Sequence, residues 1–220
     1  MSSTGFYWHE RCFWHDQGAI GVFSAPGEFL QPQAASESPE SKRRLKNILE
    51  VSGLIDELHV VKPPAATLSD LKRFHTPCYL DELQAGDNAQ GGNGGDCAPY
   101  MPGSWAAATR SAGLAIAAVE AVALGEVANA YALCRPPGHH AEADQGRGFC
   151  LLGNIPVAVL RARALGQVKR GRYSIGTFTT ATASRRRSIT TPMSSPFPSI
   201  KRPTTRWKPV VSMSRAKEPG

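Results

Sequence analysis

The stretch Ala130-Tyr-Ala-Leu-Cys134 runs directly into Arg135-Pro-Pro-Gly-His-His140. Its first part is apolar on both faces, which is typical of a strand buried inside a parallel sheet. Open α/β sheets place their active sites at the carboxyl ends of such strands. The two adjacent histidines therefore predict a functional site directly after a buried parallel strand.

The flanking sequence alternates helical and extended patterns up to about residue 168, which favours an α/β domain. The expected elements, in chain order, are an amphipathic helix over 38–53 ended by Gly53, a strand over 58–61, a capped helix start over 67–70, a helix over 77–85, a glycine-rich loop over 86–95, and a long helix over 104–124 capped by Ser104 and stopped near Gly125.

Adjacent histidines can work as a paired general acid and base, because different surroundings allow one imidazole to accept a proton while the other stays charged. The preceding Pro-Pro-Gly stiffens the chain and then allows a sharp turn toward a substrate. Taken alone, a His-His pair is more often a satisfied surface or loop pair than a catalytic one. The neighbouring motifs are needed to choose between these alternatives.

The motifs resemble those of class II histone deacetylases and their bacterial amidohydrolase relatives. The resemblance rests on these segments: Ser38-Pro-Glu before Arg44-Leu45, His75-Thr-Pro-Cys-Tyr-Leu80, Gly94-Gly-Asp96, Tyr100-Met-Pro, Ser104, Arg135-Pro-Pro-Gly-His-His-Ala-Glu142, Gly148-Phe-Cys150 and Asn154. They keep the order and spacing of the family over roughly residues 5–170. Leu152 and Gly153 depart from it, since relatives often carry Phe and Asn there.

The resemblance implies an α/β fold of the arginase/deacetylase kind, a parallel sheet flanked by helices that is incomplete in this chain. Residues 1–170 would form the N-terminal portion of the domain, and residues 171–220 a basic, disordered tail. The implied activity is zinc-dependent deacetylation of acetylated lysine, polyamines or related small amides.

The resemblance also implies roles for single residues. His139 and His140 would be catalytic, with His140 favoured as the general base. Asp96 would hold the substrate backbone, Gly148 would offer its carbonyl to the scissile amide, and Phe149 would form a wall of the acyl-lysine tunnel. The alternatives are a solvated loop acid for Asp96 and an ordinary core residue for Phe149. The other histidines, His9, His15, His59 and His75, are expected to be structural.

The family binds zinc through a later motif, Asp-Trp-Asp-Val-His-His-Gly-Asn-Gly, and through a distant downstream Asp. No histidine follows His140 and no aspartate follows Asp144 in this chain. A catalytic zinc site needs three protein ligands and an open position. We therefore predict no metal ligand among these residues, and a truncated chain that is inactive although its family is enzymatic.

A change of reading frame explains the missing motif. Shifting the frame back by one base across residues 173–183 permits Phe-Asp-Trp-Asp-Val-His-His-Gly-Asn-Gly, and the same shift across residues 209–220 permits Gly-Ser-Ile-Asp-Glu-Pro-Gly-Lys-Gly-Thr-Gly. Two matches in one frame and in the right order indicate a one-base frameshift between about Val168 and Tyr173.

The net charge of +7 belongs to the tail, because residues 169–220 hold twelve Lys/Arg and one acid, Glu218. A non-enzymatic remnant whose basic tail binds nucleic acid or acidic surfaces is thus the alternative function. Few aromatic residues interleave with the tail's charges, so nucleic acid is not the expected partner. No apolar run of membrane-spanning length is apparent, and five dispersed cysteines favour a reducing, cytoplasmic location.

Overall fold

The computed structural model describes residues 3–18, 35–168, 171–172 and 188–189. The chain forms two compact units, Met1–Gln167 and Val168–Gly220. In the second unit, strand β8 (Gly171–Arg172) pairs antiparallel with β9 (Ser188–Ile189). The remaining tail residues, for which disorder was expected, lie outside the described ranges, and the boundary at residue 170 stays a prediction.

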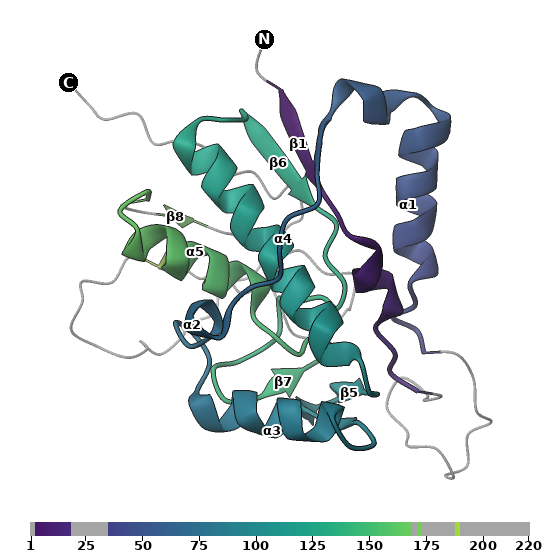
Figure 1. Ribbon diagram of the computed structural model, residues 1–220, viewed down its shortest axis with the longest axis vertical. Coiled ribbons are helices and arrows are strands. Elements are labelled where there is room, and N and C mark those ends of the chain that lie inside the picture. The colour runs from purple at the N-terminus through teal and green to yellow at the C-terminus, as the bar shows by residue number, and fades with distance from the viewer. Residues whose placement is uncertain (1–2, 19–34, 169–170, 173–187, 190–220) are drawn as a thin grey trace, which may run out of the picture. The chain divides into compact units, whose positions relative to one another are not determined.

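The first unit contains a three-stranded parallel sheet with the strand order β2-β1-β6 (Figure 1). Strand β1 (Thr4–Tyr7) lies between β2 (His59–Val61) and β6 (Asn129–Ala132). The register places Phe6 opposite Val60 on one side and Tyr131 on the other. Because the strands are parallel, their carboxyl ends share one edge, where β6 leads into the two histidines. The expected parallel sheet flanked by helices is confirmed.

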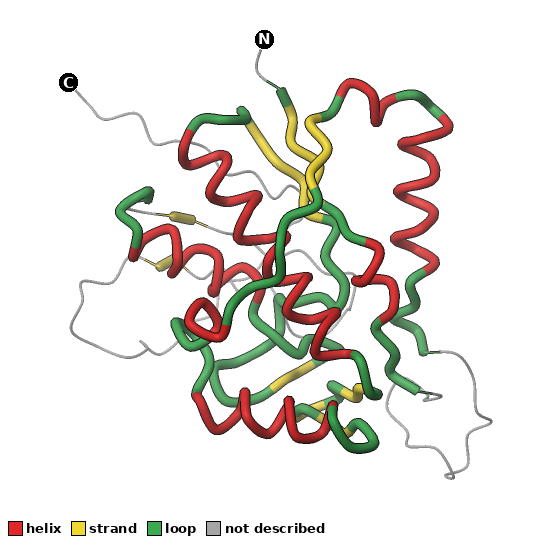
Figure 2. Tube along the Cα trace, in the orientation of Figure 1, coloured by secondary structure: helices red, strands yellow, loops and turns green. Residues whose placement is uncertain are grey.

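The strand before the histidines is less buried than predicted. It covers Asn129–Ala132, where 130–134 was expected, and Tyr131 is 51% exposed. In the described part of the chain, β6 pairs only with β1. Helix α4 packs against both strands, which are yellow in Figure 2. One face of β6 is therefore left partly open, while Leu133 is buried after the strand ends.

Helix α4 (Ser104–Leu124) is the core helix of the first unit and runs diagonally across Figure 1. It contributes to two hydrophobic clusters, one shared with α3 and α5 and one with β1 and the 3-10 helix η1 (Glu10–Trp14). Small side chains allow this close packing, since a Cβ on Gly113 would lie 2.1 Å from the Pro64 carbonyl oxygen. No apolar run of membrane-spanning length was expected, yet α4 is long and apolar enough to cross a membrane by length and composition alone. However, 61% of its apolar window is buried inside the protein, as in the core helix of a folded domain.

Ser104 does not cap this helix, as had been predicted. Gly103 occupies the cap position with a left-handed backbone, and Ser104 is the first helical residue. Its hydroxyl donates instead to the Asp16 carbonyl and contacts His15, while the Asp87 carboxylate accepts the Trp105 N–H at 2.8 Å. The helix end is as predicted, since Gly125 follows Leu124 in a left-handed conformation.

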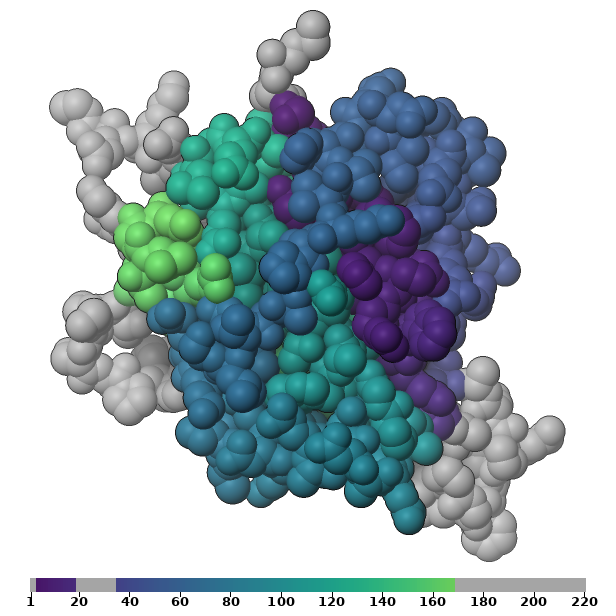
Figure 3. Space-filling view, viewed as in Figure 1, coloured from purple at the N-terminus to yellow at the C-terminus, as the bar shows by residue number. Residues whose placement is uncertain are grey.

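The other helices surround α4. They are α1 (Glu40–Val51), the 3-10 helix η2 (Leu54–Glu57), α2 (Leu68–Leu71), α3 (Pro77–Asp87) and α5 (Asn154–Ala164). Figure 3, a space-filling view, shows α4 in teal between α3 at the bottom and α1 at the upper right. The predicted end of α1 is confirmed, because Gly53 has a left-handed conformation just after the helix. The predicted start of α2 is also confirmed, because Thr67 and Asp70 form a capping box.

The predicted glycine loop carries short strands. Helix α3 extends to Asp87, so the loop begins later than expected. Within it, β3 (Gly92–Asn93) pairs with β5 (Pro99–Tyr100), and β4 (Gly95–Asp96) pairs with β7 (Gly146–Arg147). The pairing of β4 with β7 connects the glycine loop to the segment that follows the histidines.

Candidate active site at the carboxyl end of β6

Arg135, the first residue of the predicted motif, lies in the interior with 2% of its surface exposed. One terminal nitrogen donates to the carbonyls of Cys12, Phe13 and His15, the last at 2.7 Å, and the other donates to the Glu37 carbonyl at 3.1 Å. Its Nε lies 3.1 Å from Glu37 Oε2, close enough for an ion pair but without hydrogen-bond alignment. The guanidinium thereby joins the end of β6 to η1 and to the segment before α1.

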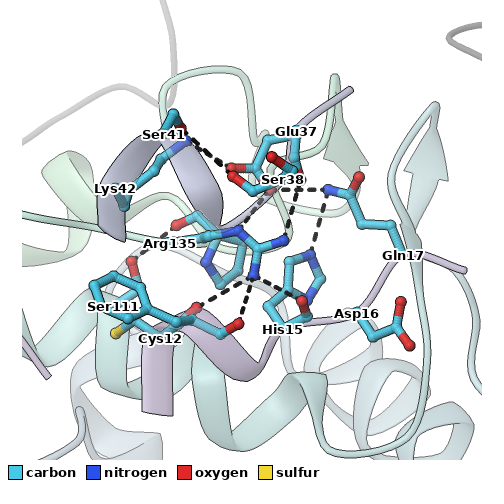
Figure 4. A network of polar contacts seen from close by, with 12 residues as sticks. Cys12, His15, Asp16, Gln17, Glu37, Ser38, Ser41, Lys42, Ser111 and Arg135 are labelled. Carbon is cyan, nitrogen blue, oxygen red and sulfur yellow. Dashed lines mark hydrogen bonds and ion pairs between the residues drawn. The ribbon is translucent and has the colours of Figure 1, made fainter. Parts of the chain in front are cut away.

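The same network continues through Glu37 and His15 (Figure 4). Lys42 Nζ lies 2.8 Å from Glu37 Oε1, and the Gln17 amide donates to Glu37 Oε2. His15 Nδ1 lies 2.9 Å from the Ser104 hydroxyl. Burial, and secondarily the Arg135 charge, lower the pKa of His15 to about 3, so its ring is neutral near pH 7.

The turn after Arg135 is held against the start of α5. The Pro136 carbonyl accepts hydrogen bonds from Ser111 Oγ at 2.8 Å and from Asn154 Nδ2 at 3.3 Å. A Cβ on Gly138 would lie 2.6 Å from both the Asn154 nitrogen and the Leu152 carbonyl oxygen. Glycine is required at 138 because backbone, rather than a movable side chain, occupies that space.

The tandem histidines follow this turn, and their rings lie against each other. The ring centroids of His139 and His140 are 4.1 Å apart with an interplanar angle of 49°. Both residues are half-buried. Burial, followed by the neighbouring His140, lowers the pKa of His139 to about 4. A neutral imidazole near pH 7 can accept a proton, which is what a general base requires.

Cys150 lies beneath the pair as a hydrogen-bonding group. Its Sγ accepts the His140 N–H at 3.4 Å and contacts the Gly148 carbonyl oxygen at 3.5 Å. His139 Nδ1 is 4.0 Å from the same sulfur. Burial raises the pKa of the Cys150 thiol to about 12, so near pH 7 it stays protonated and is not a thiolate nucleophile.

The predicted substrate residues Asp96, Gly148 and Phe149 lie together beside the histidines. Gly148 N–H donates to the Asp96 carbonyl at 2.8 Å, and Phe149 N–H donates to the Cys97 carbonyl at 2.7 Å. Gly148 and Phe149 both have positive φ, 49° and 66°. A Cβ on Gly148 would lie 2.9 Å from Cδ2 of His140, so this glycine permits the ring to lie against the backbone.

The Asp96 side chain is not buried in the site. Its carboxylate is 64% exposed and lies 3.1 Å from Nε of Arg147, which also pairs with Glu142 at 3.2 Å. Phe149 is half-buried. The structure therefore brings all five predicted residues to one end of β6, and their catalytic and binding roles stay predictions.

No zinc ligand set is present near this pair in the described ranges. Among those residues no three His, Cys, Asp or Glu side chains gather closely enough to hold a metal ion. Cys150 is a protonated hydrogen-bonding group, and Glu142 is in an ion pair with Arg147. These residues do not match the donor set that a catalytic zinc needs.

Sequence reasoning missed two residues that shape this site. Arg135 was read as part of a motif, yet a charge placed directly after an apolar strand signals a buried ion pair that needs a partner. His75 was expected to be structural, which its contacts agree with, but its place was missed: both of its ring nitrogens bind backbone next to the site. Its partners are 68 and 78 residues away, so no local pattern pointed to them.

Comparison with known proteins shows the family to which the chain belongs. The family described as "Histone deacetylase domain" matches residues 36–172. A histone deacetylase-like amidohydrolase of Pseudomonas aeruginosa is 48% identical over 170 residues, which cover 76% of this chain and 45% of the relative. An acetylpolyamine amidohydrolase of Burkholderia pseudomallei is 51% identical over 70 residues, 32% of this chain and 20% of the relative.

Among solved structures, the crystal structure of the HDA15 HD domain is similar with a TM-score of 0.65 and 28% identity. The match covers 76% of this chain and 45% of that one. This chain thus spans a little under half the length of the relatives that it matches over most of its own length.

Proposed function

Because this chain belongs to the histone deacetylase family, we propose that it carries the tandem-histidine part of an amide hydrolase. The substrates proposed are acetylated lysine, acetylated polyamines or related small amides. The proposal is carried by the contact between the His139–His140 pair and Gly148, at the carboxyl end of a parallel strand.

The residues of this chain would divide the work of amide hydrolysis among them. His140 is assigned as the general base, because its ring lies against Gly148, whose carbonyl is assigned to the scissile amide. His139 stays neutral beside it, and Cys150 Sγ accepts the backbone N–H of His140 and contacts Nδ1 of His139. Phe149 would provide an apolar wall for the acyl chain.

Asp96 would bind the substrate backbone at the rim. Its carboxylate forms an ion pair with Arg147, so an incoming backbone N–H would compete with that guanidinium. Both side chains are about half exposed or more, and exchange of an exposed ion pair for a substrate contact costs little. The position suits a recognition residue better than a structural one.

In relatives zinc would supply polarisation of the acyl carbonyl, but the described residues do not fit a zinc site, and no step is assigned to the metal here. We therefore propose that the chain with this sequence is inactive. Purified chain should show no deacetylation of an acetyl-lysine peptide or acetylated polyamine, with or without added zinc. It should also bind less than stoichiometric zinc in a calorimetric titration.

Turnover that rises with stoichiometric zinc and disappears in His140→Ala would contradict inactivity while supporting the family function. Turnover that persists in both His139→Ala and His140→Ala would contradict the assignment of the pair. A salt-dependent gel shift with short DNA tests the alternative of a tail that binds nucleic acid.

We also propose that the reading frame changes between about Val168 and Tyr173. It is supported by the permitted second reading of residues 173–183 and 209–220. Resequencing the coding DNA across codons 160–220 tests it. A restored base should reveal Asp-Trp-Asp-Val-His-His, and the corrected protein should then deacetylate; an unchanged reading that excludes this motif would overturn the proposal.

A further inference from the structure

His75 lies between α2 and α3 and is 2% exposed. Its Nδ1 is 3.2 Å from the Ala143 carbonyl oxygen, and its Nε2 is 2.9 Å from the Gly153 nitrogen. Ala143 and Gly153 are the two ends of the segment that carries Gly148 and Phe149. One rigid ring therefore spans both ends of the candidate substrate-binding segment.

The two contacts determine the state of the ring. A carbonyl oxygen only accepts, so Nδ1 must carry the proton that it donates to Ala143. A backbone N–H only donates, so Nε2 must be unprotonated to accept from Gly153. The imidazole is thus neutral, with the proton on Nδ1. Burial supports this state, because it lowers the pKa of His75 to about 4.

Neighbouring groups reinforce the same attachment. Thr76 N–H donates to the Ala143 carbonyl at 2.9 Å, and the Tyr79 hydroxyl donates to the Leu151 carbonyl at 2.8 Å. The ring of His75 packs against Phe74 and Tyr79, with centroids 4.8 Å and 5.5 Å away. The start of α3 therefore holds the segment at several points, and His75 alone bonds to both of its ends.

The middle of the segment has contacts of its own, because β7 pairs with β4 and the Gly146 N–H donates to the Gly94 carbonyl at 2.6 Å. At the tip, Gly148 and Phe149 have positive φ angles and donate to the carbonyls of Asp96 and Cys97, and the Gly148 carbonyl accepts from Cys150 Sγ at 3.5 Å. Any shift of the segment ends would change these bonds and the contact between Gly148 and the His140 ring. Fixed ends therefore add to the contacts that keep the tip in place.

We propose that His75 is a positioning residue whose neutral, Nδ1-protonated imidazole fixes both ends of residues 143–153 and thereby sets Gly148 and Phe149 against His140. This deepens the proposed function, because it concerns how the same site is held. The physical claim itself requires no catalytic turnover, so it can fail or hold separately from the assignment as a deacetylase.

Amide hydrogen exchange followed by NMR tests the proposal on the full chain. The reporters are the amides of Gly148 and Phe149, whose bonds lie at the tip, and the reference is the Leu133 amide, bonded to Tyr7 at 2.8 Å in the other hydrophobic cluster. In His75→Phe, which removes both bonds, exchange at the reporters should rise about tenfold or more, while Leu133 changes less than about twofold.

Two further variants control for shape and for folding. His75→Gln keeps a donor and an acceptor at similar separation and should return the reporters to within about threefold of the parent. Tyr79→Phe removes one bond to the segment, at Leu151 near its second end, and should accelerate the reporters less than His75→Phe does. If His75→Phe does not fold, the Gln and Tyr79 variants still measure the effect.

The imidazole nitrogens give an independent readout in the unmodified chain. Long-range nitrogen–proton NMR spectra at pH 6 should show a protonated Nδ1 and an unprotonated Nε2 for His75. Equal acceleration at Leu133 and the reporters in His75→Phe, or the opposite tautomer or a cationic ring at pH 6, would overturn the proposal.

Discussion

The Arg135 network and the tandem histidines lie four residues apart at one strand end, yet they are built in opposite ways. Arg135 is enclosed, and its guanidinium contacts four carbonyls and a carboxylate. His139 and His140 are half-buried, and their rings lie tilted against each other. Buried polar groups with several partners help to specify a structure, whereas groups left accessible remain able to react.

The difference shows how the frame of the site is separated from its chemistry. Partners of Arg135 come from η1 and from the segment before α1, about 100 to 120 residues away in sequence. They fix where β6 ends, and Gly138 then directs the chain to the histidines. Damage to the first region should therefore appear as lost stability, and damage to the second as changed chemistry or geometry of the pair.

Arg135→Met should have the largest effect. It leaves the buried Glu37 carboxylate with Lys42 as its remaining cation and removes the donor to four carbonyls, so the free energy of unfolding should fall by about 3 kcal/mol. Urea denaturation measures this. Arg147→Met is the matched control in the same stretch of chain, because its side chain is 47% exposed. Similar losses for both variants would show that burial does not separate the two arginines.

Gly138→Ala should come next. The new Cβ would meet backbone atoms of Leu152 and Asn154 at 2.6 Å, and overpacking against backbone should cost about 2–3 kcal/mol of unfolding free energy. Gly53→Ala is the control, since Gly53 has a φ of 76° but open space around its Cβ position. It should cost about 1 kcal/mol from backbone strain alone. A smaller loss for Gly138→Ala than for Gly53→Ala would show that the turn yields easily.

Local signals in the sequence predicted much of the fold. The capping box of Thr67 and Asp70 and the glycines at 53 and 125 depend on neighbours within a few residues, so pattern alone located them. Helix α5 was not predicted, although Pro156 in its first turn is a common helix-start residue. Its burial against α4 rather than its own pattern defines it.

The failures involve partners that are distant in sequence. Ser104 has a good capping side chain, but its hydroxyl is taken by His15 and Asp16, and Asp87 serves the helix end instead. The candidate site shows the same limit. The sequence motifs named the histidines and Gly148, which the structure places side by side. They gave no indication that Arg135 and His75 bind backbone that lies many residues away.

The pH dependence of stability gives a third test of the buried Arg135 network, because His15 belongs to that network. His15 is neutral in the folded protein, with a pKa of about 3, whereas in the unfolded chain its pKa returns to the ordinary 6.5. Below pH 6.5 the unfolded state therefore binds a proton that the folded state does not, and stability falls as pH falls. The contribution is about 1.4 kcal/mol per pH unit between roughly pH 5.5 and 4.

His15→Gln should reduce the slope of unfolding free energy against pH by that amount over the same window, measured by urea titrations at several pH values. Ser104→Ala is the control, because it removes a partner of the ring but keeps the titrating group. It should lower stability at every pH with the slope nearly unchanged. An unaltered slope in His15→Gln would show that the ring is charged or solvated in the folded protein.

Asp96→Asn should have the smallest effect on stability, less than about 0.5 kcal/mol, because Asp96 and Arg147 pair at an exposed surface. A double-mutant cycle with Arg147→Gln should give a coupling energy in the same range, whereas Glu37→Gln with Arg135→Met should couple far more strongly. This contrast bears directly on function, since a carboxylate that contributes little to folding is free to bind substrate. A coupling above about 1.5 kcal/mol would instead make Asp96 part of the frame and remove it from the rim.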